Sequence, residues 1–183
     1  AFCNAGFDLM GINEEYSSFT KYAADPLVNI RIMLLIIIGG IGFTIWNEVR
    51  TKKFKLSRYS LHAKIVISTT LILVFGGGLF LYIFEKNNTI AGMDTPGAIF
   101  ASLFGSVTAR TAGFNTVDTA ALTQESKLLT IVLMFIGGSP GSTAGGIKTT
   151  TMAVMIIYIV SYMRGSNGCN VFGRKISSEV IEK

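Results

Sequence analysis

The sequence predicts an all-α, polytopic membrane protein. Three observations support this fold class: the apolar residues lie in long blocks, the basic residues cluster at the ends of these blocks, and one glycine motif occurs twice. Half of the 183 residues are hydrophobic and only 15% are charged, whereas soluble globular domains have about 25% charged residues. This composition argues against a soluble enzyme.

Three apolar blocks predict the membrane helices. Residues 27–46 and 65–84 each have about the 20 residues that a helix needs to cross the hydrocarbon, so each is expected to be one span. Residues 128–163 are too many for one crossing and contain a glycine-rich break at 137–146, which predicts a discontinuous helix. Residues 96–107 begin with a proline suited to a first helical turn and are short enough for a re-entrant helix.

The basic residues predict the orientation of these spans. The link after the first span is rich in them, whereas the link at 85–96 holds only Lys86. Lys and Arg in short loops stay on the cytoplasmic side, so the first link and the segment after the third block are expected to face the cytoplasm. This pattern accounts for the net charge of +5, and no nucleic-acid partner is expected. The basic residues of the first link are Arg50, Lys52, Lys53, Lys55, Arg58 and Lys64.

A motif of a polar residue followed by Ala-Gly-Phe occurs twice, 107 positions apart. Each copy precedes a span and the second follows the expected re-entrant helix, which predicts pore-loop repeats. A pore removes water from a cation by pointing main-chain carbonyls at one axis, and glycine permits the positive φ that this requires. The carbonyls expected to hold the ion belong to Asn4, Ala5, Gly6, Phe7, Thr111, Ala112, Gly113 and Phe114. A tight turn between helices is the alternative for each copy.

The glycine-rich break is expected to be a gate below these motifs. It comprises Gly137, Gly138, Ser139, Pro140, Gly141, Ser142, Thr143, Ala144, Gly145, Gly146 and Lys148. Glycine and proline disfavour helix there, and the polar side chains can bind the freed backbone or face water. A phosphate-binding loop is not expected, because Ile147 separates the last glycine from the lysine and apolar spans flank the break. A passive break that fills space between helices is the alternative.

Arg110 precedes the second motif, and a charge at membrane depth is a functional candidate. Because a cation beside a cation path would repel the substrate, Arg110 is expected to support the filter from behind, through a salt bridge or by clamping carbonyls. His62 is the only histidine. No catalytic set can be assembled around it, so no enzymatic activity is expected.

Residues 1–8, 108–116 and 137–148 together closely resemble the Trk/Ktr/HKT family of potassium-uptake proteins, most nearly the Ktr-type membrane subunit. The resemblance extends over nearly the whole chain and implies four pore-loop repeats around one filter. Residues 1–50 would supply the filter strand and inner span of the second repeat, and 51–63 a cytoplasmic link. Residues 64–163 would form the third repeat with its broken inner helix, and 164–183 a cytoplasmic link toward the fourth. The first and fourth repeats are expected to be missing from the sequence.

The resemblance also implies the substrate and the partners. K⁺ is the expected substrate and Na⁺ a candidate coupling ion, with no cofactor bound by this chain. The implied assembly is a multi-pass homodimer in the lipid bilayer of the plasma membrane, in contact with a cytosolic ring that binds ATP or ADP. Two alternatives stay open: a sodium-selective or sodium-translocating relative on the same scaffold, and a non-transporting membrane scaffold subunit.

Overall fold

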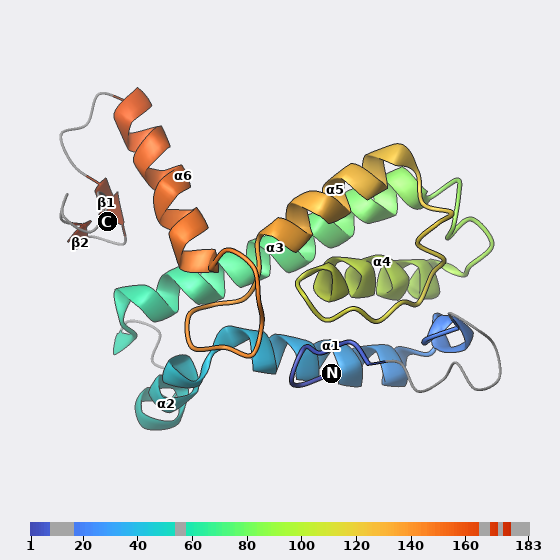
Figure 1. The fold of residues 1–183 in the computed structure, drawn as a ribbon, viewed down its shortest axis with the longest axis horizontal. Coiled ribbons are helices and arrows are strands. Elements are labelled where there is room, and N and C mark those ends of the chain that lie inside the picture. Colours follow the sequence, from blue (N-terminus) through green and yellow to red (C-terminus); the bar gives the residue numbers. More distant parts are fainter. Residues whose placement is uncertain (8–16, 54–57, 165–168, 172–173, 177–183) are drawn as a thin grey trace.

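The computed structural model describes residues 1–7, 17–53, 58–164, 169–171 and 174–176, which form a helical bundle and one short strand pair (Figure 1). The helical fold class is confirmed. The helices are α1 (Pro26–Ile41), α2 (Phe43–Lys52), α3 (Leu61–Glu85), α4 (Thr95–Ala109), α5 (Gln124–Phe135) and α6 (Thr149–Met163), with a 3-10 turn at Thr20–Tyr22. Strands β1 (Cys169–Val171) and β2 (Arg174–Ile176) pair antiparallel near the C-terminus.

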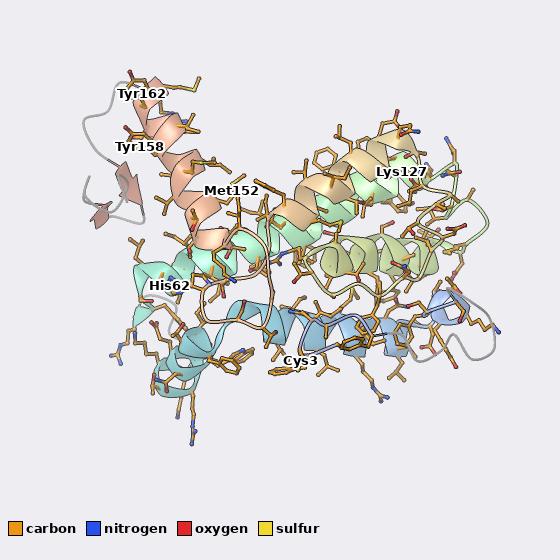
Figure 2. All side chains as sticks on the ribbon, in the orientation of Figure 1. Cys3, His62, Lys127, Met152, Tyr158 and Tyr162 are labelled. Carbon is orange, nitrogen blue, oxygen red and sulfur yellow. The ribbon has the colours of Figure 1, made fainter. Side chains whose placement is uncertain are left out.

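The long helix α3 organises the bundle. It contacts α4, α5 and α6, and α4 packs against both α3 and α1 (Figure 1). Helix α6 leaves the bundle at an angle, and its Tyr158 and Tyr162 are exposed (Figure 2). Among the described residues, α3 alone is a single helix long and apolar enough to cross a membrane, and α1 with α2 qualifies if that bent pair is counted as one span.

Three predicted elements form as helices. Residues 65–84 lie inside α3 and residues 96–107 inside α4. The block 128–163 is interrupted as expected, because α5 ends at Phe135 and α6 begins only at Thr149. Helices α3 and α5 begin at hydroxyl caps, since Ser60 accepts from the amide of Ala63 and Thr123 from that of Ser126.

Residues 27–46, expected to be one span, do not form one straight helix. The helix ends at Ile41, and α2 leaves it at 97°. Gly42 forms the corner with φ +96°, a conformation that glycine adopts without the steric cost that a Cβ brings. The apolar residues continue through the corner, so hydropathy does not reveal it. Hydropathy measures how readily a residue leaves water and carries no information about the direction of the backbone.

The corner leaves no free carbonyl at the end of α1. A helix end normally leaves its last four carbonyls without partners inside the helix. Here residues 38–41 accept hydrogen bonds from the Trp46 indole of α2 and from Ser139 and Thr143 of the glycine-rich break. The segment that contains the glycine-rich break, residues 136–148, is called the intramembrane loop below. The loop and α2 therefore cap α1 together.

The central apolar core lies where α1, α3, α4 and the second glycine motif meet. Phe104 and Val107 of α4 are each 1% exposed there. The core thus fixes the end of α4, from which the second glycine motif emerges. Its buried members are Met33, Ile36, Val74, Phe104, Val107, Ala112 and Phe114.

Candidate functional site

The two Ala-Gly-Phe segments, residues 4–7 and 111–114, lie side by side. A Cβ built on Gly6 would stand 2.6 Å from the carbonyl oxygen of Ala112, and one on Gly113 would stand 3.3 Å from the Cα of Gly6. The first segment belongs to the N-terminal stretch that runs along α1, where Cys3 is labelled in Figure 2. Two stretches 107 positions apart therefore face each other with no side chain between the two glycines.

The segments share an unusual backbone. The φ angles are +48° at Asn4 and +65° at Gly6, and +73° at Thr111 and +83° at Gly113, whereas the alanines between them have negative φ. Thr111 is β-branched, and a positive φ at such a residue is a genuine outlier that persists where the surroundings enforce it, often at functional sites. The matched alternation of φ shows that the two segments adopt the same backbone conformation.

Most main-chain oxygens of these segments have no hydrogen-bond donor, whereas the Phe114 carbonyl accepts from Thr108. Among the described residues, none of the hydrogen bonds ends on the carbonyls of residues 4–6 or 111–113. The amides of Ala112 and Gly113 turn back to the Thr108 carbonyl at 3.0 and 3.4 Å. Both segments border one cavity of about 830 Å³, whose other walls come largely from α3, α4 and α5.

The two phenylalanines of the motif have different surroundings. Phe114 is buried and packs edge-on against Phe19, with ring centroids 5.5 Å apart. Phe7 is 82% exposed. The residue after Phe7 in the first motif, Asp8, lies outside the described residues.

Thr108 holds the second segment, and sequence reasoning did not single it out. Its hydroxyl donates to the Phe114 carbonyl at 2.6 Å and accepts from the Phe114 amide at 2.9 Å. This pair of bonds folds the segment back onto the end of α4. The first segment has Ala1 at the corresponding position, so comparing the two copies of the motif gives no signal for this role.

Arg110 caps the C-terminus of α4, next to the second segment. Its side chain is buried and its Nε has no hydrogen-bond partner. Within the described ranges no carboxylate lies at ion-pair distance from the Arg110 guanidinium, and no carbonyl accepts a hydrogen bond from this side chain. The expected salt bridge or carbonyl clamp is thus absent from the described part of the chain.

The intramembrane loop is a closed, hydrogen-bonded structure. Its two stems pair through Gly137 N to Ile147 O at 2.9 Å and Gly138 N to Gly145 O at 3.3 Å. Lys148 donates to the carbonyl of Ala144 at 2.9 Å. The polar side chains therefore satisfy backbone that is freed by the helix break, which irregular backbone at membrane depth requires.

The loop also touches the first glycine segment. The Thr143 hydroxyl lies 3.0 Å from the carbonyl of Phe2 and 3.4 Å from Asn4 Nδ2. No described hydrogen bond joins the loop to residues 108–116. The structure thus brings the sequence-predicted residues into two contacting groups, the paired segments and the loop.

Comparison with known proteins identifies the family. All residues from 1 to 183 match the TrkH cation transport proteins. The chain belongs to this family. The TrkH family consists of membrane-embedded cation transporters and not of enzymes, so the polytopic membrane fold expected from the sequence is confirmed.

Relatives within the TrkH family include two curated bacterial proteins. The chain is 39% identical over 186 residues to the Ktr system potassium uptake protein B of Bacillus subtilis, covering 100% of this chain and 40% of the relative. It is 34% identical over 182 residues to the potassium/sodium uptake protein NtpJ of Enterococcus hirae, covering 99% and 39%. The chain therefore spans about 40% of the length of these relatives.

A solved structure of the TrkH family shares the fold. The potassium transporter TrkH of Vibrio parahaemolyticus superposes with a TM-score of 0.70 at 19% identity, over 99% of this chain and 38% of the other. At this identity the likeness concerns the fold. The chain thus has the fold of this solved transporter.

Proposed function

We propose that this chain forms part of a transmembrane K⁺ uptake pathway in which main-chain carbonyls of residues 4–7 and 111–114 replace the water of the ion. One observation carries the proposal: two facing segments repeat the same alternation of φ, and among the described residues the carbonyls of residues 4–6 and 111–113 accept no hydrogen bond. Carbonyl rings of this kind replace the hydration shell in cation-selective filters. The names of the two curated relatives, which specify uptake of potassium or of potassium and sodium, support this substrate class.

The second candidate is a sodium-selective or sodium-translocating protein on the same scaffold. The relative from Enterococcus, named for potassium and sodium, favours it. Na⁺ is also the candidate coupling ion for K⁺ uptake. Rubidium and sodium uptake measured in the same vesicles separates the two candidates, because a K⁺ pathway admits rubidium in preference to sodium.

The intramembrane loop is the proposed gate. It is hydrogen-bonded to the end of α1 and to the stretch that carries the first glycine segment. A loop at this position would block ions beside the proposed path. Arg110, a buried cation behind the second segment, is the proposed filter support. Its partner would then come from a part of the transporter beyond the described residues.

The remaining features of the assembly are proposed from the resemblance of the sequence to this family. Residues 51–63 and 164–183 are the proposed cytoplasmic links, and their basic residues would face a cytosolic nucleotide-binding ring or anionic lipid. The phrase Ktr system in the name of the Bacillus relative supports a transporter with more than one component. A membrane homodimer in the plasma membrane is the proposed state.

Deleting residues 138–145 tests the gate. In vesicles that contain the full-length transporter with this sequence, the deletion should raise initial rubidium uptake, because the barrier is removed while Gly137 and Gly146 still join α5 to α6. The amount of folded protein is checked by size-exclusion chromatography. Unchanged or lower uptake by a folded deletion variant would refute the gating role.

A further inference from the structure

The Thr143 hydroxyl lies where the loop meets two other structures, the N-terminal stretch and the end of α1. It lies 3.0 Å from the carbonyl of Phe2, 3.2 Å from that of Gly39 and 3.4 Å from the amide nitrogen of Asn4. The three partners belong to the N-terminal stretch with the first glycine segment and to the end of α1. A threonine hydroxyl has one proton to donate and two lone pairs, so it bonds one carbonyl at a time and accepts from Asn4.

Close backbone packing makes this contact possible. A Cβ on Gly39 would stand 1.9 Å from the carbonyl oxygen of Phe2, so the N-terminal stretch lies directly on the glycine face of α1. The Thr143 amide donates to the Gly39 carbonyl at 3.2 Å. One residue of the loop is thereby fixed to α1 by its main chain and to the first segment by its side chain.

Ser139 also attaches the loop to α1, and its described hydrogen bonds outside the loop reach only α1. Its amide donates to the Gly40 carbonyl at 3.0 Å, and its hydroxyl contacts the carbonyls of Gly40 and Ile41. None of its described hydrogen bonds goes to the first segment. Ser139 and Thr143 thus both attach the loop to α1, and of these two only Thr143 also reaches the first segment. This difference can be tested.

We propose that Thr143 is a positioning residue that couples the loop to the filter, so that the loop sets the conformation of the first glycine segment as well as blocking the path. This inference rests on the proposed function of the loop and the segments. Asn4 has φ +48°, a strained conformation that persists where its surroundings enforce it. When the Thr143 hydroxyl contacts are lost, Asn4 and Phe2 lose their partner, and the segment is free to relax from the geometry that presents its carbonyls. Loosening the loop from α1 at Ser139 leaves these contacts in place.

The experiment compares four variants of the full-length transporter in vesicles. Thr143→Val removes the hydroxyl at nearly constant volume, and Thr143→Ser retains it. Ser139→Ala loosens the loop from α1 alone. Ser142→Ala is the matched control, because the Ser142 side chain accepts only from the Ala144 amide inside the loop. Initial rates of rubidium and sodium uptake are measured for each, and their ratio does not depend on the amount of protein.

Loss of one hydrogen bond corresponds to about a fivefold shift of an equilibrium. Rubidium uptake should therefore rise about fivefold in Ser139→Ala and in Thr143→Val. The rubidium-to-sodium ratio should fall only in Thr143→Val, while Thr143→Ser and Ser142→Ala keep the wild-type ratio. Thr143→Ala, which introduces no new methyl contact, repeats the test if the valine variant does not fold.

Two results would overturn the coupling. Either the ratio in Thr143→Val and Thr143→Ala equals that of wild type, or it falls equally in Ser139→Ala. The deletion of residues 138–145 tests the gate separately. If it leaves flux unchanged, the gate fails, whereas a ratio that changes only in the Thr143 variants without a hydroxyl still supports the contact with the filter.

Discussion

Alanine at Gly6 should impair ion selectivity more than alanine at Gly113. Both glycines have a positive φ, +65° and +83°, and an L-residue pays about 1–2 kcal/mol in that region. The difference lies in what the new Cβ meets. At Gly6 it would stand 2.6 Å from the Ala112 carbonyl oxygen, which is backbone, whereas at Gly113 its nearest contact is the Gly6 Cα at 3.3 Å.

The magnitude follows from these contacts. Real Cβ atoms essentially never approach closer than 3.0 Å, so in Gly6→Ala the Ala112 carbonyl must shift by about 0.4 Å. That carbonyl is one of the proposed ion ligands. If the strain of about 1–2 kcal/mol falls on the ion-bound geometry, rubidium uptake at limiting concentration drops about tenfold, since 1.4 kcal/mol corresponds to a factor of ten. Gly113→Ala should show a smaller loss, and Gly113→Ser should likewise weaken the discrimination.

The assay is competitive uptake of rubidium and sodium into vesicles with the full-length transporter. Gly92→Ala is the matched control, because a Cβ there meets nothing within 4 Å. The reasoning is refuted if Gly6→Ala folds with wild-type thermal stability and keeps the wild-type rubidium-to-sodium ratio. It is also refuted if Gly113→Ala has the larger effect.

Three further substitutions test other parts of the structure. Thr108→Val removes both hydrogen bonds to Phe114 and should lower the rubidium-to-sodium ratio in the same assay with little loss of thermal stability. Glu85→Gln weakens hydrogen bonds that the buried carboxylate accepts from the loop after α3 and from the start of α5. It should lower the stability in detergent by about 2 kcal/mol, while the exposed Glu125→Gln should not. Gly42→Ala places a Cβ 2.8 Å from two atoms of the intramembrane loop at φ +96°, and should increase cleavage of the loop by added protease.

Composition and repetition sufficed for most of the fold. The uncharged block at 65–84 predicts α3 to within four residues at its start and one at its end, because a membrane helix needs a continuous apolar surface along its whole length. The doubled Ala-Gly-Phe motif correctly indicates two segments of like conformation. That these segments face each other follows from packing across α1 and α4, which no local pattern encodes.

The bend at Gly42 is a feature that the sequence did not predict. Three glycines occur among residues 39–42, and they are the one local sign of a corner. Glycine is also frequent in membrane helices, so the three glycines alone do not distinguish a corner from a straight helix. What fixes the corner is distant in sequence: the Phe43 amide donates to the Gly141 carbonyl at 3.1 Å, and Ser139 caps the end of α1.

Distance in sequence also explains why the sequence gives no sign of contact between the proposed gate and the proposed filter. The Thr143 hydroxyl and the Phe2 carbonyl are separated by 141 positions, and neither residue type indicates the other. The end of α1 supplies the link, because its last carbonyls need partners and the loop provides them. A loop that caps a helix cannot move without exposing that end, so opening carries a cost that depends on α1 as well as on the loop. The conformation of the α1–α2 corner, although remote in sequence from the proposed ion path, therefore contributes to the free energy of opening the proposed gate.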